Sequence, residues 1–324
     1  MDEQINFINS KPSNQPKSTK ISYFTLAINS KTVLLTDISV HILLFISFLW
    51  SRKQPVQVKQ NIHFSEWEAY MNPFKSSQVS GEMLYVITWC LPFFILLISF
   101  IYQIKRFKNN EKYRLLLNHI PAYWFAFADF VDGLMQYTLA VLLTSFTVQF
   151  IKFLVGRPRP DMFSRCWPDK SLLASRTFEF RRSLSMNPDD FIHTCKNDSL
   201  SDETTNTIMM NSAFKSFPSG HAGYSMAGCM SVALYLIGKF GTFSKRGRSN
   251  AVTLVLPSLL VFLSIYTGLT RLEDFKHHPG DILVGWAIGA VFAWVSYTIY
   301  FPPVGSNKSR YSYRQLSMLE RLAD

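Results

Sequence analysis

Hydrophobic residues in this chain are gathered into six long blocks that are separated by polar and charged segments. Each block is close to the roughly 20 residues that an α-helix needs to cross the hydrocarbon core of a bilayer. The blocks are 33–50, 83–102, 127–151, 222–237, 251–269 and 282–301. This pattern predicts an all-α, polytopic membrane protein whose fold is a bundle of six transmembrane helices.

Two of these blocks carry small residues at spacings that suit helix contacts. The fourth block is rich in Gly, Ala and Ser, which favour close packing between helices over contact with lipid, so its interpretation as a span is the weakest of the six. The sixth contains Gly285 and Gly289, which are four residues apart. This small-xxx-small pair predicts a close contact within the bundle, with dimerisation as the alternative.

Basic residues between the blocks predict how the chain is oriented. Lys and Arg cluster after the second and fourth blocks and again in the C-terminal segment. The positive-inside rule places these segments, and with them both termini, in the cytoplasm. Residues 1–30 are then a polar N-terminus without the apolar region of a cleavable signal peptide, 31–304 a membrane domain, and 305–324 a mobile cytoplasmic tail. Asp37 and Asp132 fall near the cytoplasmic ends of their blocks and are expected to be structural.

The chain carries a formal net charge of +11. A basic balance can indicate nucleic-acid binding, but the sequence has no zinc-ligand spacing, basic helix or aromatic nucleic-acid motif. Basic cytoplasmic loops explain most of the excess, and part of it is available to a phosphorylated substrate. We therefore expect the lipid bilayer as a partner and no nucleic acid, while the sequence predicts no oligomeric state.

The first candidate motif closes the third block. Lys152 is followed by Arg157 and Arg159, and Pro158 and Pro160 prevent the helix from continuing. The chain must therefore turn at the membrane surface, where three cations come together. Basic residues at the end of a span are also common as interface anchors, which is the alternative for this motif.

The second motif opens the fourth block with Pro218, Ser219, Gly220 and His221. A helix N-terminus presents unpaired backbone N–H groups and the positive end of the helix dipole, and both favour phosphate. Gly220 allows the backbone to approach a ligand, the Ser219 hydroxyl can donate a hydrogen bond, and His221 can transfer a proton near neutral pH. The alternative is an ordinary capped helix with an unrelated histidine.

The third motif opens the sixth block and consists of Arg271, His277 and Asp281. His277 and Asp281 are four residues apart, so on a helix they would share a face. A carboxylate beside an imidazole fixes its tautomer and stabilises its cation, as in catalytic His–Asp pairs. His278 is a rival, three residues from Asp281, and a solvated cluster of basic residues is the alternative for the whole motif.

Together the three motifs place cations, two histidines and one carboxylate at helix ends on one predicted side of the membrane. Phosphoryl transfer requires positioning and neutralisation of charge on the phosphoryl oxygens, and this set provides both. The motifs resemble the three-part signature of the type 2 phosphatidic acid phosphatase superfamily, with Thr270-Arg271 in place of the usual Ser-Arg. The stretches 156–161 and 274–278 are most similar to lipid phosphate phosphatases, including the diacylglycerol pyrophosphate phosphatase-like branch.

This resemblance implies a role for each signature residue. His277 would attack phosphorus, Asp281 would orient it, and His221 would protonate the leaving oxygen. The phosphate would be held by Lys152, Arg159, Ser219, Gly220 and Arg271. The resemblance also implies an active site on the lumenal or extracellular face, no metal and no cofactor, with the cations in the role that a metal ion would fill.

The expected reaction is hydrolysis of phosphatidate, diacylglycerol pyrophosphate or a related membrane lipid phosphate through a phosphohistidine intermediate. Because the motifs adjoin apolar blocks, a lipid could reach the site with its chains still in the bilayer. Two alternatives stay open. One is a phosphatase of the same fold for a polyprenyl diphosphate or a sugar phosphate. The other is a catalytically silent lipid-binding relative, which would lack signature histidines or cations that are present here.

The long loop 152–217 is expected on the lumenal or extracellular side, where disulfide bonds form and glycans are added. Cys166 and Cys195 lie in this loop and are expected to pair, with two free thiols as the alternative. Asn197 opens a glycosylation sequon in the same loop. Cys90 and Cys229 lie within apolar blocks and are expected to be free.

Overall fold

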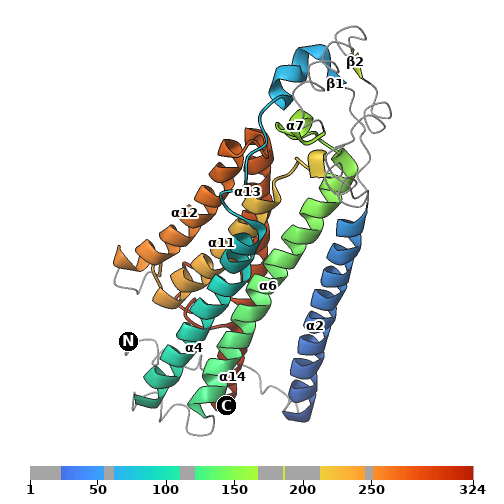
Figure 1. Ribbon diagram of the computed structural model, residues 1–324. Helices are drawn as coiled ribbons and strands as arrows, with labels where there is room; N and C mark the ends of the chain where they lie inside the picture. The colour runs from blue at the N-terminus through green and yellow to red at the C-terminus, as the bar shows by residue number, and fades with distance from the viewer. Residues whose placement is uncertain are drawn as a thin grey trace.

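A computed structural model of the protein describes residues 23–54, 62–109, 121–166, 185–186, 212–244 and 251–323. Long helices make up most of it (Figure 1). The only β-structure in the described ranges is an antiparallel pair of two-residue strands, β1 (Ile62–His63) and β2 (Ser185–Met186). The fold class is therefore all-α, as predicted.

Six helical segments correspond to the six apolar blocks. In chain order they are α2 (Tyr23–Lys53), the continuous run of α3 (Gly81–Tyr85), η2 (Val86–Cys90) and α4 (Leu91–Asn109), α6 (Ala122–Val155), α11 (Gly220–Phe240), α12 (Val252–Glu273) and α13 (Pro279–Tyr300). Three shorter helices lie in the connections and near the C-terminus: η1 (Phe64–Tyr70), α7 (Met162–Cys166) and α14 (Tyr313–Ala323).

Five of the six segments are long and apolar enough to cross a membrane, counted over the described residues, and α11 is not one of them. Most residues of α11 are buried, and it packs against α13, α12 and α6. Because these neighbours shield it from lipid, α11 can carry the Gly, Ala and Ser residues that lowered its apolar character in the sequence. The protein is an integral membrane protein with five candidate spans and α11 as an inner helix.

A close crossing of α11 and α13 explains the glycines of the sixth block. A Cβ atom on Gly285 would lie 2.6 Å from the Ser219 carbonyl oxygen, and one on Gly289 would collide with the carbonyl oxygen of Gly223. The small-xxx-small face is therefore used within the bundle, as predicted. The same crossing joins the two helix starts, where the Ser219 N–H donates to the Asp281 carbonyl oxygen at 2.9 Å.

The C-terminal segment is not the mobile tail that its polar sequence predicted. It forms α14, which packs on α6. Arg314 of this helix donates to the Asp132 carboxylate at 3.0 Å, and Gln315 donates to the Phe125 carbonyl oxygen at 2.9 Å. Leu319 is buried in a small apolar cluster at the same place. A polar segment can thus be ordered when its few apolar residues share one helix face.

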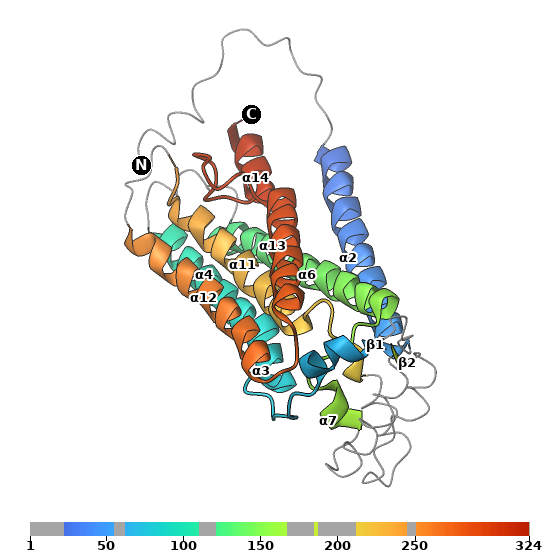
Figure 2. The same cartoon turned by 90° about the horizontal axis from the view of Figure 1, so that it is seen from above.

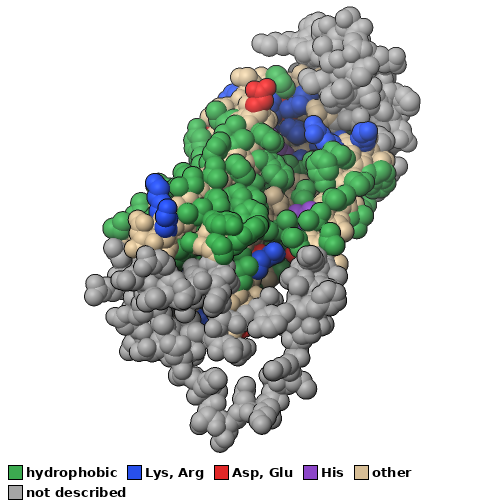
Figure 3. Space-filling model, turned by 90° about the horizontal axis from the view of Figure 1, so that it is seen from below, with side chains coloured by type: hydrophobic (Ala, Val, Ile, Leu, Met, Phe, Trp, Pro, Cys, Tyr) green, Lys and Arg blue, Asp and Glu red, His purple; other side chains and the backbone are tan. Residues whose placement is uncertain are grey.

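The arrangement of the helices leaves α2 at one side of the bundle. Both ribbon views place α6 between α2 and the other long helices (Figures 1 and 2). Hydrophobic side chains cover the middle of the face in Figure 3, and Lys and Arg side chains gather toward its ends. This distribution fits an apolar belt in a bilayer with charged ends at the two interfaces.

Candidate active site

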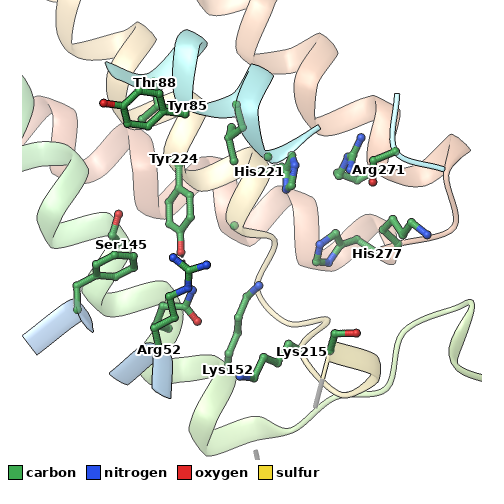
Figure 4. Close-up of a pocket in the computed structure, with 18 of the residues that line it drawn as sticks. Arg52, Tyr85, Thr88, Ser145, Lys152, Lys215, His221, Tyr224, Arg271 and His277 are labelled. Carbon is green, nitrogen blue, oxygen red and sulfur yellow. Dashed lines mark hydrogen bonds between the residues drawn. The ribbon is translucent and has the colours of Figure 1, made fainter. Parts of the chain in front are cut away.

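The three motifs meet in one cavity of about 1120 Å³. Its signature residues come from the end of α6 and from the segments next to the starts of α11 and α13. The end of α6 and the start of α13 lie at the opposite end of the bundle from α14 (Figure 1). Six of the eight predicted catalytic and phosphate-binding residues border it: Lys152, Arg159, Gly220, His221, Arg271 and His277. The other two, Ser219 and Asp281, are fully buried. Residues that are far apart in the sequence therefore converge on one site (Figure 4).

The first motif is shaped by the end of α6. Gly156 adopts the left-handed conformation (φ 59°) and closes the helix, and its N–H donates to the Lys152 carbonyl oxygen at 3.1 Å. The Arg159 N–H then donates to the Ala213 carbonyl oxygen at 2.8 Å. Burial, and next the charge of Arg165, lower the pKa of Arg159 to about 9, and its Nε has no partner among the described residues. A guanidinium whose buried Nε donor is unused is suited to binding an anion.

A buried ion-pair cluster ties the first motif to the third. Asp161 accepts hydrogen bonds from Arg165 at 2.7 and 2.9 Å and from Lys276 at 2.9 Å. All three side chains are at most 6% exposed. Arg165 follows the first motif and Lys276 directly precedes His277, so this carboxylate holds the two loops at a fixed separation. Arg165 and Lys276 also border the cavity, but each already has a carboxylate partner.

The second motif begins α11. Ser219 is the N-cap residue, and the Ala222 N–H approaches its hydroxyl oxygen at 3.5 Å, the outer limit of a hydrogen bond. Gly220 borders the cavity at the helix N-terminus, where backbone N–H groups are available to an anion. The buried Nε2 of His221 has no hydrogen-bond partner in the described ranges. The motif therefore offers anion-binding backbone groups beside an unused imidazole nitrogen.

His277 is fixed by a backbone carbonyl. Its Nδ1 lies 2.7 Å from the Ser216 carbonyl oxygen, which can only accept, so Nδ1 carries the proton and Nε2 keeps its lone pair. Burial and the charge of Arg159 outweigh the opposing effect of Asp281 and hold the pKa of His277 well below its ordinary value of 6.5. The imidazole is therefore neutral at physiological pH, which is the form that a nucleophile requires.

The helical geometry expected for His277 and Asp281 is not the one observed. His277 precedes the first residue of α13, and its Nδ1 is 3.8 Å from the nearer Asp281 oxygen. Asp281 instead accepts from Arg157 at 2.7 Å, from the Ser216 hydroxyl at 2.5 Å and from the His278 N–H at 2.9 Å. The last bond makes Asp281 the capping-box residue of α13. Asp281 therefore makes no direct hydrogen bond to His277. It acts on His277 through its negative charge and by holding Ser216, whose carbonyl oxygen contacts His277 Nδ1.

His278, the rival candidate, is placed differently from His277. It is the N-cap residue of α13 and does not border the cavity. Its ring packs edge-on against Tyr70, with 5.8 Å between ring centroids, and its Nδ1 lies 3.3 Å from Asp281. The geometry therefore favours His277 as the histidine that meets a substrate.

Arg271 is held by a carboxylate that the signature does not contain. It donates to Asp274 at 2.7 Å, and Asp274 also accepts from the Gln78 N–H at 3.0 Å. In the same segment before α3, Val79 makes a backbone hydrogen bond to the His221 side chain. The segment before α3 lies outside the three motifs. It nevertheless helps to orient Arg271 of the third motif and His221 of the second.

The charged side chains of the cavity wall are basic. Nine Lys and Arg side chains border it, and no Asp or Glu among the described residues does. Another part of its wall is apolar and comes from α2, α3, η2 and α6, including Phe48, Leu84, Trp89 and Val141. One cavity therefore joins a cationic end to a hydrocarbon-compatible wall, which suits a ligand with an anionic head and apolar chains.

The three sequence motifs give no role to Ser216, Asp161 or Asp274, and in them Arg157 is only one cation of the first motif. Their contacts join loops that are more than 60 residues apart, so no local pattern could reveal the partners. The available signal was their position, because each lies inside or directly beside a motif. Polar residues packed against signature residues are therefore candidates for orienting them.

Two expectations for the long loop fall outside the described residues. Cys195 and Asn197 are not in the described ranges, so the Cys166–Cys195 bridge and the glycan stay predictions. Cys90 and Cys229 are free, as expected. Among the residues that the structure describes, no group of three or more His, Cys, Asp or Glu side chains is arranged to hold a metal ion.

Comparison with known proteins agrees with the geometry of the site. The chain is 29% identical over 191 residues to the probable diacylglycerol pyrophosphate phosphatase 1 of Schizosaccharomyces pombe. This alignment covers 59% of this chain and 61% of that protein. It is 32% identical over 187 residues to lipid phosphate phosphatase 2 of Arabidopsis thaliana, or 57% of each chain. It is 31% identical over 173 residues to diacylglycerol pyrophosphate phosphatase 1 of Saccharomyces cerevisiae, or 53% of each chain.

These alignments span between 53% and 61% of the length of the three relatives. No solved structure matches the chain. Residues 133–303, more than half of the chain, match the PAP2 superfamily, and this range includes all three motifs. The chain therefore belongs to the PAP2 superfamily.

Proposed function

We propose that this protein is a metal-independent phosphatase that hydrolyses phosphatidate, diacylglycerol pyrophosphate or a related lipid phosphate. The observation that carries the proposal is the single cavity in which two histidines and a cationic end adjoin an apolar wall between α2, η2 and α6. Relatives named lipid phosphate phosphatase and diacylglycerol pyrophosphate phosphatase support the same reaction. A soluble phosphate ester would leave the apolar wall without a partner.

The chemistry begins at His277. Its Nε2 forms a bond to phosphorus while the bond from phosphorus to the lipid oxygen breaks, and the electron pair leaves with that oxygen. His221 in its protonated form supplies the proton that this oxygen takes up. The phosphorylated imidazole becomes cationic, and the Ser216 carbonyl at Nδ1 together with the Asp281 charge stabilises it.

A water molecule completes the reaction. It attacks the phosphohistidine, His221 accepts one of its protons, and phosphate leaves as His277 regains its lone pair. In both steps Lys152, Arg159 and Arg271 offset the charge on the phosphoryl oxygens, with the N-terminus of α11 contributing backbone donors. These cations take the role of a metal ion, so chelation with EDTA should leave activity unchanged.

The position of the cavity supports an active site on the lumenal or extracellular face. The signature residues that border it adjoin the end of α6 and the start of α13, and these helix ends lie opposite α14 (Figure 1). The positive-inside rule assigns the α14 end to the cytoplasm, together with both termini. A tag at Asp324 should therefore become accessible to antibody only after the membrane is permeabilised, and access in intact, correctly oriented cells would reverse this orientation.

The function is tested with purified protein in liposomes and a panel of two-chain lipid phosphates, lipid pyrophosphates and glucose phosphate. We expect a much higher kcat/KM for the two-chain lipids than for glucose phosphate, with and without EDTA. Equal kcat/KM values for the lipids and for glucose phosphate would favour a soluble substrate. Activity that is lost in EDTA and restored by magnesium would contradict the metal-independent mechanism. Lipid binding without hydrolysis would identify a silent relative.

A further inference from the structure

The cationic end of the cavity carries more charge than one phosphate needs. The signature supplies Lys152, Arg159 and Arg271, whereas a phosphate monoester carries about two negative charges. Arg52 and Lys215 also border the cavity but belong to no signature motif. Neither has an ion-pair partner in the part of the chain that the structure describes. Like charges gathered around one cavity attract a second anionic group.

Arg52, Lys152 and Lys215 form one cluster. Arg52 is in the last turn of α2, Lys152 is in the last turn of α6, and Lys215 precedes the second motif, so three separate segments supply the charges (Figure 4). Lys215 is half-buried, and burial, followed by the charges of Arg159 and Arg52, lowers its pKa. The cations are therefore close enough to interact.

The cluster lies on the path between the apolar wall and His277. Phe48 and Leu49 are about one helical turn before Arg52 on α2, and both border the cavity. Lys152 also affects the electrostatics of His277, which places it at the catalytic side of the cluster. A lipid whose chains follow α2 would pass Arg52 first, then Lys152, before its outermost group reaches the histidine.

We infer that Arg52 and Lys215, together with Lys152, form a second phosphate subsite that binds the inner phosphate of a lipid pyrophosphate while its terminal phosphate lies at His277. The inference rests on the proposed function. In this reaction the bond from Nε2 to the terminal phosphorus forms and the bridging P–O bond breaks, and the electron pair stays on the released lipid monophosphate. The cluster stabilises that charge directly, so the step depends less on a proton from His221.

The test compares two substrates with identical acyl chains, a lipid pyrophosphate and its monophosphate. The double variant Arg52→Gln/Lys215→Gln removes two of the cavity cations that lie outside the signature. Its control, Lys105→Gln/Lys108→Gln, removes the same charge from exposed positions near the end of α4. We expect the first variant to lower kcat/KM by about 10- to 100-fold for the pyrophosphate and less than about threefold for the monophosphate. The control should change neither.

The pair Arg52→Lys/Lys215→Arg keeps both charges and should retain most of the pyrophosphate activity, which separates charge from loss of folding. Equal losses on both substrates in the Gln variant would overturn the inference. A weaker inhibition by inorganic phosphate with an unchanged substrate ratio would also overturn it, because the ligand would then be free phosphate.

Binding provides a readout that is independent of turnover. In the His277→Ala background, the Gln variant should weaken binding of the pyrophosphate more than binding of the monophosphate. Wild-type protein that hydrolysed neither lipid would contradict the proposed function, and this binding comparison would still decide for or against the subsite. Equal weakening of both lipids would reject it.

Discussion

Two polar clusters lie at opposite ends of the bundle and differ in how completely their groups are paired. At the α14 end, the buried Asp129 accepts a hydrogen bond from Tyr235 at 2.8 Å and forms an ion pair with Lys239. At the cavity end, the buried Nε atom of Arg159 and Nε2 atom of His221 have no partners in the described ranges. Buried polar groups are normally paired, so the first cluster stabilises the fold and the second is prepared for a ligand.

The largest loss of activity at the cavity end is expected from His277→Ala. Because the nucleophile is lost, both turnover and the trapped phosphoenzyme should disappear, while the paired cluster at the α14 end keeps the protein folded. Turnover and trapping with radiolabelled phosphate measure the two effects. His278→Ala is the matched variant and should still form the phosphoenzyme. The opposite pattern would transfer the nucleophilic role to His278.

His221→Ala should have the next largest effect. Loss of general acid catalysis should lower turnover of a lipid monophosphate by about 10²–10⁴-fold. The loss should be much smaller for an aryl phosphate whose leaving group needs no proton. Equal losses with both substrates would indicate that His221 binds phosphate and does not act as the acid.

The α14 end is tested by Lys239→Met, which leaves Asp129 buried without its cation. Removing one partner of a buried ion pair should lower the free energy of unfolding by about 3–5 kcal/mol. Denaturation in detergent measures this change, and KM for the lipid should stay the same in the folded fraction. Asp129→Asn/Lys239→Met should recover part of the stability. A Lys239→Met protein with normal stability but altered KM would remove the distinction between the two ends.

Gly285→Ala tests the helix crossing that connects the second and third motifs. The added methyl group would press on the Ser219 carbonyl oxygen, so stability should fall by about 1–3 kcal/mol. Gly280→Ala on the same helix is the control, because a Cβ atom there meets nothing within 4 Å. Thermal unfolding of both variants gives the comparison. Equal stability would show that the crossing relaxes without cost.

The smallest effect concerns pH. A lowered pKa keeps His277 neutral at more acidic pH, so the acidic limb of kcat/KM that belongs to this group should fall below pH 6.5. A pH series in liposomes measures it, with the ionisation of the lipid phosphate followed separately by phosphorus NMR. An acidic limb of kcat/KM at or above pH 6.5 that does not come from ionisation of the lipid phosphate would contradict a buried, neutral His277.

The sequence predicted the helices and the signature residues because both are local patterns. Apolar blocks of membrane length specify helices. The contact of Gly285 and Gly289 was predicted for the same reason. The polar pattern of the C-terminal segment does not predict that the segment is ordered. The contact that holds it, from Arg314 to the Asp132 carboxylate, joins residues that are far apart in the sequence.

The contacts that orient His277 could not be predicted in this way. The expected pairing with Asp281 assumed that both residues lie on one helix, whereas α13 begins after His277. Its closest partner is the Ser216 carbonyl oxygen, and a backbone carbonyl has no residue-specific signal in a sequence. Arg52 lies outside every motif, so its place at the cavity follows only from the position of α2.

The glycine contact between α11 and α13 has a consequence for how the substrate range of the proposed phosphatase could change. Because the two helix backbones touch, the helices that carry or adjoin His221 and His277 form a stiff reaction centre. By contrast, α2 packs chiefly on α6 and contributes part of the apolar wall. Substitutions on α2 can therefore retune which lipid enters while the distance between the two histidines stays constant. We expect an exchange of the α2 segment between relatives to transfer lipid preference and to leave the chemistry intact.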